Sequence, residues 1–246
     1  MDKPEKLNKP RLGMQHFNNN VLCAVDVETT GTDPEKDEIV QLAILPLDSD
    51  FNPSKVIQPV NFFIKPEHPF EYYASQGDLE CGIKAIKIAC DIGIDAYTAG
   101  NLIADVWFPR LITQKLKQIM PLAHNWIFDS AFLRKFFGNK TYELMFHFHY
   151  RDSMTVATFL NDVAGVTRQD YPFARMGLNN LINALGMERL KDHDALTDCL
   201  YTARVYQQLV RVYQSLWTGP IKNFNIPELG GPVFGNSSTE TRTSES

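Results

Sequence analysis

The sequence predicts an α/β fold, a mixed five-stranded sheet flanked by helices, and three observations lead to it. A continuous apolar run at residues 21–25 is typical of a strand that is buried on both faces of a sheet. Turn-forming residues, Gly31 with Asp33 and Pro34, separate this run from a second strand-like segment and predict an antiparallel hairpin. Strand-like and helix-like segments then alternate, which adds parallel strands to the sheet.

Five segments have the length and composition of strands. The first two form the hairpin, and the fifth alternates aromatic residues with His147 and His149, as a half-exposed strand does. The predicted strands are residues 21–25, 38–47, 60–64, 121–124 and 144–150.

Six segments carry apolar residues at helical spacing, and Gly138 and Gly186 are glycines that end two of them. The predicted helices are residues 83–90, 98–119, 130–137, 153–160, 178–185 and 195–216. In the second of these helices we expect the inward side chains to be Leu102, Val106, Phe108, Leu111, Leu116 and Ile119.

Composition divides the chain into three parts. Residues 1–19 are polar and rich in Asn and Lys, and we expect a flexible arm there. Residues 20–218 hold the apolar patterns and form one domain. Residues 219–246 are expected to be irregular and then disordered, because the stretch 235–246 contains no apolar residue.

The overall composition excludes several classes of protein. Of 246 residues, 44% are hydrophobic and 22% are charged, which excludes disorder of the whole chain. No apolar run reaches the roughly 18 residues of a membrane span, and the N-terminus lacks the apolar core of a signal peptide. The net charge of −5 argues against holding nucleic acid by bulk electrostatics. If the protein handles nucleic acid, we expect a local site in which metal ions supply the positive charge.

The cysteines indicate a reducing compartment. Cys23, Cys81, Cys90 and Cys199 form no Cys-x-x-Cys pair, so neither a zinc ribbon nor a dithiol redox motif is indicated. Without a signal peptide, we expect free thiols and a cytoplasmic location.

Asp26 and Glu28 are the first candidate site residues. They follow the buried strand, and side chains two residues apart in a strand point to the same face, so both carboxylates can meet one cation. The same Asp-x-Glu spacing recurs at Asp33 and Asp78, but neither pair follows a buried strand, and we interpret them as solvated loop charges. The structural alternative for Asp26 and Glu28 is a strand end that reaches solvent.

A His-x4-Asp spacing occurs three times, beginning at His124, His147 and His193. Asp129 opens a helix, where it is either a functional acid or an N-cap. For the second pair we favour a strand histidine and a helix-capping Asp152; a metal site formed by the histidines at 147 and 149 would need further ligands. His193 lies in a loop where it can reach over a site, and Asp198 is fixed one turn into the last helix.

These motifs resemble those of the DEDDh, or DnaQ-like, 3′–5′ exonucleases. Residues 25–31 (VDVETTG) are similar to the first family motif, residues 124–129 (HNWIFD) to the second, and residues 193–198 (HDALTD) to the third, in the order of the family. The resemblance extends over roughly residues 20–214. Position 194 is Asp rather than the Tyr of the tyrosine variant, which favours the histidine class.

The resemblance implies an RNase H-like fold and a phosphodiester hydrolase. It implies that Asp26, Glu28, Asp129 and Asp198 bind two Mg²⁺ or Mn²⁺ ions. It also implies that His193 is the general base, a role that suits an imidazole with a pKa near the usual value of about 6.5. The substrate contacts that it implies come from Thr29, Thr30, Gly31, Thr32, His124, Asn125 and Trp126.

Two positions depart from the family pattern. Thr32 stands where a leucine often wedges against the terminal bases, and Trp126 replaces a small residue, so both bear on how the 3′ end is held. Trp126 either stacks on a base or is a buried structural side chain, and we favour the second. The segment 66–93 has no clear family counterpart; it either lines the substrate groove or, as we favour, forms a surface insertion.

The predicted function is metal-dependent 3′–5′ hydrolysis of single-stranded nucleic acid to nucleoside monophosphates, with DNA slightly favoured. An RNA-directed exonuclease, similar to oligoribonuclease or RNase T, is the first alternative, because no residue settles recognition of the 2′-hydroxyl. A non-catalytic binding module that keeps the fold is the second. The expected partners are a single-stranded 3′ end and a polymerase or other replication protein, with no membrane.

Overall fold

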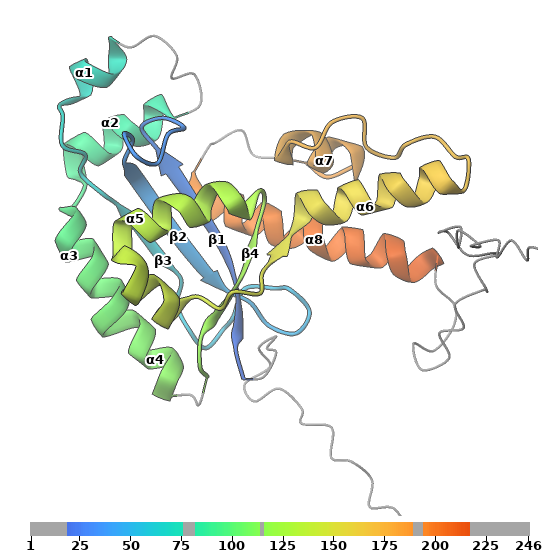
Figure 1. Ribbon diagram of the computed structural model, residues 1–246, viewed down its shortest axis with the longest axis horizontal. Helices are drawn as coiled ribbons and strands as arrows, with labels where there is room; N and C mark the ends of the chain where they lie inside the picture. Colours follow the sequence, from blue (N-terminus) through green and yellow to red (C-terminus); the bar gives the residue numbers. More distant parts are fainter. Residues whose placement is uncertain (1–18, 76–81, 114–115, 189–193, 217–246) are drawn as a thin grey trace, which may run out of the picture.

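A five-stranded sheet in the order β3-β2-β1-β4-β5 forms the centre of the molecule (Figure 1). The computed structural model describes residues 19–75, 82–113, 116–188 and 194–216. β2 pairs antiparallel with β1 and β3, whereas β4 pairs parallel with β1 and β5. The predicted mixed five-stranded sheet with flanking helices is therefore confirmed. The strands are β1 (Val21–Thr29), β2 (Ile39–Pro46), β3 (Val60–Phe63), β4 (Ile119–Ala123) and β5 (Arg151–Asp152).

Alternate residues of β1 serve the two faces of the sheet. Val25 and Val27 belong to the core cluster on the side of α5 (Trp126–Met145), and Ala24 belongs to the cluster beneath α8 (Ala195–Leu216). This burial on both faces explains the continuous apolar run. By the same alternation, Asp26 and Glu28 lie on the α8 face.

The predicted helix over residues 98–119 is wrong in its length and in part of its inward face. Three consecutive helical pieces stand in its place: α3 (Ala96–Asn101), the π-helix η2 (Leu102–Trp107) and α4 (Phe108–Thr113). A π turn holds more residues than an α turn and rotates the buried face. Leu102 and Val106 are therefore 38% and 47% exposed, whereas Ile103 and Trp107 are buried.

The other inward residues expected in that helix are buried, but not all of them are helical. Phe108 and Leu111 lie in α4, as predicted. Leu116 follows the helix, and Ile119 opens β4. The end of the predicted helix, residues 116–119, is therefore a connection and the first residue of a strand.

The predicted strand over residues 144–150 is also wrong. Gly138, with φ 70° and ψ 152°, closes the first part of α5 as expected, but helix resumes and continues to Met145. Only Phe146 bridges to β4, and the paired strand is β5. The alternating aromatic residues do not share a buried face, because Phe146 is 3% exposed and Phe148 is 78% exposed.

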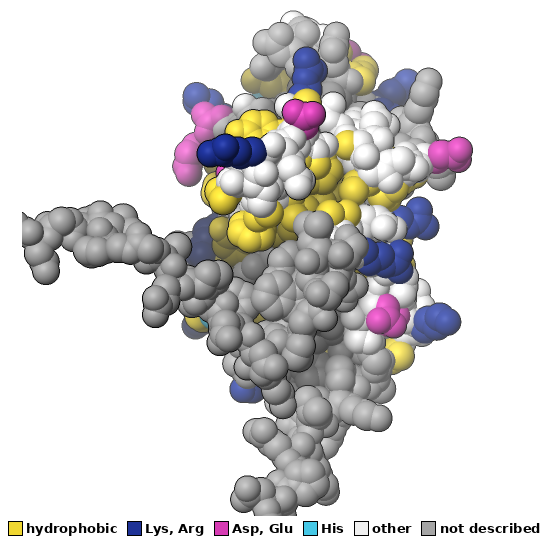
Figure 2. Space-filling model, turned by 90° about the vertical axis from the view of Figure 1, so that its right-hand side faces the viewer, with side chains coloured by type: hydrophobic (Ala, Val, Ile, Leu, Met, Phe, Trp, Pro, Cys, Tyr) yellow, Lys and Arg dark blue, Asp and Glu magenta, His cyan; other side chains and the backbone are white. Residues whose placement is uncertain are grey.

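The remaining predicted helices are present, α8 at its predicted bounds. α1 (Phe70–Ala74) lies where the sequence predicts loops, and α2 is Ile83–Ile92. α6 (Ser153–Val166) and α7 (Leu178–Ala184) pack with α8 around a separate small core. Figure 2 views the molecule from this end and shows a band of hydrophobic side chains on it. Phe159, Val166 and Tyr171 are exposed hydrophobic residues of α6 and the segment after it.

The expectations about the chain ends and the cysteines can be compared with the structure only where it describes those residues. Residues 1–18 of the expected arm and all of the expected tail lie outside the described residues, so the three-part division of the chain stays a prediction. Cys23, Cys90 and Cys199 are free thiols, as expected, and Cys81 is not among the described residues. None of the described helices combines the length and apolar character needed to cross a membrane.

Candidate metal centre

Asp26 and Glu28 lie side by side at the end of β1. Both are half-buried on the α8 face, while Val27 between them is buried in the opposite core. Antiparallel pairing places Asp26 opposite Ala43 and Glu28 opposite Gln41 of β2, and the register shifts immediately after Glu28. The central strand therefore ends with two carboxylates on one face.

Asp198 in α8 completes a close group of three carboxylates. Small side chains of α8, among them Ala195 and Cys199, pack against the sheet and allow the helix to approach it closely. Asp198 follows within the first turn and is 9% exposed. One carboxylate oxygen from each of Asp26, Glu28 and Asp198 lies within 4.8 Å of the other two.

This donor set fits a divalent metal ion. Carboxylate oxygens are the ligands that Mg²⁺ and Mn²⁺ prefer. Oxygens bound to a single Mg²⁺ stand roughly 3–4 Å apart, so small side-chain rotations bring the three carboxylates of the group to that spacing. A cation between them also offsets the repulsion of three like charges.

Asp129, the fourth predicted ligand, lies next to this group without belonging to it. It is 3% exposed in the first turn of α5, and its Oδ1 accepts the Val27 backbone N–H at 3.2 Å. The helix begins after Asn125, so the N-cap alternative for Asp129 is wrong. Burial raises the pKa of Asp129 well above its usual range, and the nearby charges of Asp152 and Glu28 act in the same direction.

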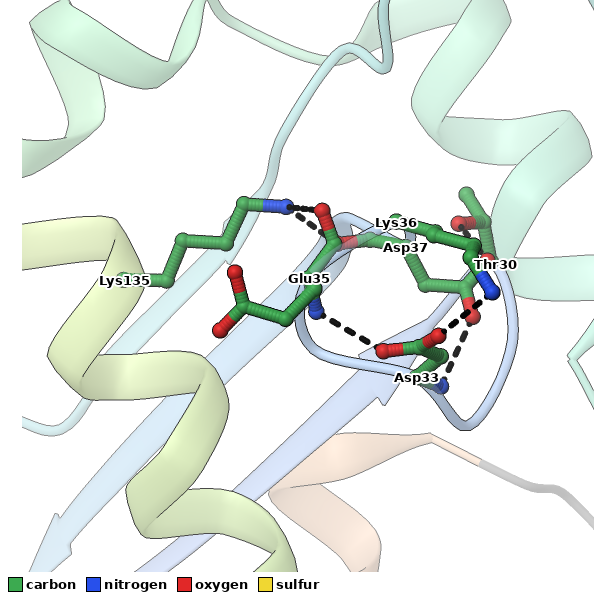
Figure 3. A network of polar contacts seen from close by, with 6 residues as sticks. All are labelled: Thr30, Asp33, Glu35, Lys36, Asp37 and Lys135. Atoms are coloured by element: carbon green, nitrogen blue, oxygen red, sulfur yellow. Dashed lines mark hydrogen bonds and ion pairs between the residues drawn. The ribbon is translucent and has the colours of Figure 1, made fainter.

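A network of polar contacts holds the β1–β2 loop that follows the two strand carboxylates (Figure 3). The Asp37 carboxylate accepts the Thr30 hydroxyl at 3.2 Å and the Asp33 backbone N–H at 2.8 Å. Lys135 of α5 donates to the carbonyl oxygens of Glu35 and Asp37, at 3.2 and 3.1 Å. The loop is therefore fixed both from inside and from the neighbouring helix.

Gly31 is needed at its position in this loop. A Cβ atom there would overlap the Asp37 carboxylate that fills the inside of the turn. Gly31 is recognisable from the sequence as a turn residue, whereas Asp37 and Lys135 are not. Their contacts join residues that are distant in the sequence or enclosed by the turn.

A hollow of about 710 Å³ lies beside the loop, and residues 30–32 form part of its wall. His68 and Tyr72 line it from the segment before and within α1, with ring centroids 4.1 Å apart. The Tyr73 hydroxyl donates to Glu38 at 2.9 Å and ties α1 to the end of the loop. Glu67, His68, Tyr72 and Tyr73 thus line the hollow, and a role of this segment in substrate binding stays a prediction.

Residues 124–129, the second motif, run from the end of β4 into α5 and contact the start of α6. Asn125 has a left-handed backbone (φ 75°, ψ 57°) and precedes α5. Trp126 is 4% exposed and packs near Phe146, so its ring has little free face for a base. Its backbone N–H donates to Asp152 at 2.6 Å. Asp152 also caps α6 by accepting from two backbone N–H groups, as the structural interpretation of the second His-x4-Asp pair expects.

His124 joins the end of β4 to the start of α6. Its Nδ1 lies 2.8 Å from the Ser153 hydroxyl, which itself donates to the Ala123 carbonyl oxygen at 3.2 Å. The hydroxyl oxygen therefore accepts from the protonated Nδ1. Burial lowers the pKa of His124, although the charge of Asp152 acts in the opposite direction.

Lowering the pH should destabilise the protein through His124. Because its folded-state pKa lies below the unfolded value, the unfolded chain binds a proton first, and stability is lost as the pH falls below about 6.5. Asp129, whose pKa is raised, acts in the opposite direction, so the comparison between proteins is the test. Relative to the wild type, we expect His124→Gln to lose less of its urea midpoint between pH ~7.5 and pH ~5.5. Equal pH dependence in both proteins would contradict this assignment.

Part of the predicted site lies outside the described residues. His193 belongs to the segment 189–193 that precedes α8. Asp78 and Glu80, which we interpreted as solvated loop charges, belong to the segment 76–81 and also lie outside the described residues. The structure therefore brings together Asp26, Glu28 and Asp198, with Asp129 adjacent.

The family model described as "Exonuclease" matches residues 23–76. This match contains Asp26, Glu28 and the β1–β2 loop, and it extends through α1. The expectation that residues 66–93 lack a family counterpart is therefore corrected for residues 66–76. None of the curated proteins matches the sequence.

Solved structures of exonuclease I have a similar fold. The enzyme of Methylocaldum szegediense is 23% identical with a TM-score of 0.56, over 80% of this chain and 41% of that chain. E. coli exonuclease I in complex with a dT13 oligonucleotide is 20% identical with a TM-score of 0.56, over 80% and 43%. The zinc-bound form of the E. coli enzyme with ssDNA is 23% identical with a TM-score of 0.57, over 80% and 42%.

The chain spans less than half the length of these exonuclease I structures. The structural likeness shows a fold similar to that of exonuclease I, and the match to the family model covers the first two carboxylates. Both findings agree with the resemblance of the sequence motifs to the DEDDh 3′–5′ exonucleases.

Proposed function

We propose that this protein is a divalent-metal-dependent 3′–5′ exonuclease that acts on single-stranded nucleic acid, with DNA favoured. The observation that carries the proposal is the convergence of Asp26, Glu28 and Asp198 on one face of the sheet, at the end of β1. The loop that follows β1 lines a hollow with its residues 30–32. Exonuclease I structures solved with dT13 or ssDNA support single-stranded DNA as the substrate class. A polymerase or other replication partner rests on the family resemblance alone.

The acidic residues would hold two Mg²⁺ or Mn²⁺ ions. Asp26, Glu28 and Asp198 supply direct oxygen ligands, and Asp129 adds a fourth carboxylate beside them. Bound divalent ions would supply Lewis acidity, which stabilises the charge that develops on the phosphate and favours ionisation of water. Through the Val27 N–H, Asp129 also holds the strand between the two neighbouring carboxylates.

Proton transfer is proposed for His193, five residues before Asp198 in the sequence. A neutral imidazole at physiological pH can take the proton of the attacking water. Thr29 at the end of β1, with Thr30, Gly31 and Thr32 of the loop that follows, would hold the terminal nucleotide while the bond is cleaved.

The hollow gives the terminal nucleotide a place to bind. Tyr72 is 45% exposed on its wall and next to His68, and an exposed aromatic ring offers a stacking face to any base. The tie between Tyr73 and Glu38 holds this wall at a fixed position relative to the loop. Trp126, by contrast, would contribute as a buried support for the second motif, together with His124 and Asn125 beside it.

Tyr72→Ala should raise KM for a single-stranded oligonucleotide and leave kcat nearly unchanged. Loss of one stacking contact costs about 1–3 kcal/mol of binding free energy, which corresponds to a KM that is higher by roughly 5- to 150-fold. Tyr72→Phe keeps the ring and serves as the matched control, so its KM should stay near that of the wild type. A normal KM for Tyr72→Ala would remove this wall from the substrate site.

The proposed substrate class is tested with DNA and RNA oligonucleotides of one sequence and length, each labelled at the 5′ end. Faster shortening of the DNA would support the proposal, and faster shortening of the RNA would favour the RNA-directed alternative. Binding of either strand without hydrolysis in Mg²⁺ or Mn²⁺ would favour the non-catalytic module.

A further inference from the structure

Gln41 is a polar residue in an otherwise apolar strand. It lies in β2, whose remaining residues are Ile39, Val40 and the segment 42–46, and its exposed fraction is 0%. A buried side-chain amide is unfavourable unless its donors and acceptor are paired. We therefore expect the side-chain amide of Gln41 to have hydrogen-bond partners within the protein.

Those partners lie mainly at the start of α8. The Gln41 Oε1 accepts the Ala195 backbone N–H at 3.2 Å, and its Nε2 donates to the Asp194 carboxylate at 2.7 Å. The same Nε2 also donates to the Asn61 side-chain oxygen in β3, at 2.9 Å. The amide thus uses both of its ends to join two strands of the sheet to one helix terminus.

The contacts of Asp194 extend this tie to Asp198. The second carboxylate oxygen of Asp194 accepts the Thr197 backbone N–H at 3.0 Å, which caps the helix. The Asp194 carbonyl oxygen accepts the Asp198 backbone N–H at 2.8 Å. Gln41 therefore holds the turn of helix that carries the third carboxylate of the metal centre.

The register of β1 and β2 places Gln41 next to one of the metal-centre carboxylates. Gln41 lies opposite Glu28 in the β1–β2 pair, and both side chains belong to the α8 face. Glu28 reaches the metal centre from the strand, whereas Asp198 reaches it from the helix that Gln41 anchors. A shift of the first turn of α8 along the sheet would separate these two carboxylates.

We propose that Gln41 is a positioning residue that sets Asp198 against Asp26 and Glu28 for divalent-metal binding. The inference rests on the proposed function, because it assumes that the three carboxylates hold metal. Gln41 acts through the backbone and carboxylate of α8 and contacts neither substrate nor metal in this role.

Two variants together test the donor and acceptor pattern. Gln41→Glu keeps an acceptor for the Ala195 N–H but sets a carboxyl group against Asp194. We expect its Mn²⁺ affinity, measured by isothermal titration calorimetry, to fall about 10- to 100-fold. Adding Asp194→Asn restores a donor opposite the new carboxylate and keeps an oxygen for the Thr197 cap, so most of the affinity should return.

Asn61→Ala is the matched control. It removes a partner of Gln41 that is not part of α8, and Mn²⁺ affinity should stay near the wild-type value. Thermal unfolding of every variant separates positioning from general stability. A fall in melting temperature with unchanged Mn²⁺ affinity in Gln41→Glu would overturn the proposal, as would a double variant no better than the single one.

Failure of this inference is distinguishable from failure of the proposed function. Wild-type protein that binds Mn²⁺ but hydrolyses no nucleic acid would overturn the exonuclease proposal, while the affinities of the variants would still decide the role of Gln41. Wild-type protein that binds no Mn²⁺ would overturn both. Normal hydrolysis and normal Mn²⁺ affinity in Gln41→Glu would overturn the positioning role alone.

Discussion

Asp26→Asn is expected to lower the rate of nucleotide release by at least about 10³-fold. The substitution keeps the shape of the side chain but removes one negative charge from a group whose oxygens lie within 4.8 Å of one another. Divalent cations depend on ligand charge in such a site, so loss of one of the three converging carboxylates weakens the binding of the metal. The measurement is the initial rate on a 5′-labelled single-stranded oligonucleotide at saturating Mn²⁺.

Asp162→Asn is the control for this change. Asp162 is exposed on α6, so the same chemical substitution should leave both rate and melting temperature unchanged. The Asp26 variant should also keep a cooperative unfolding transition, because its side chain is only half-buried. An Asp26 variant that retained more than about a tenth of wild-type turnover would remove this residue from the metal centre.

His193→Ala is expected to lower kcat by about 10²- to 10⁴-fold while Mn²⁺ affinity stays nearly unchanged. The reason is the division of roles: the carboxylates hold the metal, and the imidazole only takes a proton during the reaction. Turnover at saturating Mn²⁺ and Mn²⁺ affinity by calorimetry should therefore separate in this variant. The opposite separation, with metal affinity lost and metal-saturated turnover kept, would contradict the role of general base.

His147→Gln is the matched control for the histidine. His147 begins the second His-x4-Asp pair, whose acid caps α6, and its Nδ1 accepts the His149 backbone N–H at 3.0 Å. Glutamine retains an acceptor for that contact. Turnover and metal affinity should both stay at wild-type levels, which would show that the spacing alone has no catalytic meaning.

The parts of the fold that could be predicted are those in which local pattern and tertiary burial agree. The run at residues 21–25 is apolar on both faces because α5 and α8 cover both faces of β1. The hairpin follows from the turn chemistry after Glu28, and α8 was predicted at its observed bounds because its apolar spacing is unbroken.

The errors arose where the backbone departs from standard periodicity. The π-helix η2 rotates the buried face, so Ile103 and Trp107 replaced Leu102 and Val106 in the core. After Gly138 the chain returns to helix, which a single glycine with positive φ does not reveal in the sequence. Alternating aromatic and histidine residues then imitated a strand without sharing a buried face.

The part of the site that could be predicted from the sequence is the part in which the ligands lie close together along the chain. Asp26 and Glu28 follow from strand alternation, and their convergence with Asp198 was expected only from the family resemblance. The roles of Gln41, Asp37 and Lys135 were not predictable, because they depend on hydrogen bonds across the sheet, within a loop and from a neighbouring helix. The sequence does mark Gln41 as unusual, because it is the one polar residue in the apolar segment 39–46.

The central claim is that Asp26, Glu28 and Asp198 form a metal centre that removes nucleotides from a 3′ end. The most direct measurement is a time course with 5′-labelled single-stranded DNA in Mg²⁺, in Mn²⁺ and in excess chelator. We expect a ladder that shortens one nucleotide at a time from the 3′ end and stops in the chelator. Internal cleavage, a ladder that persists in the chelator, or DNA that is bound but never shortened would contradict the claim.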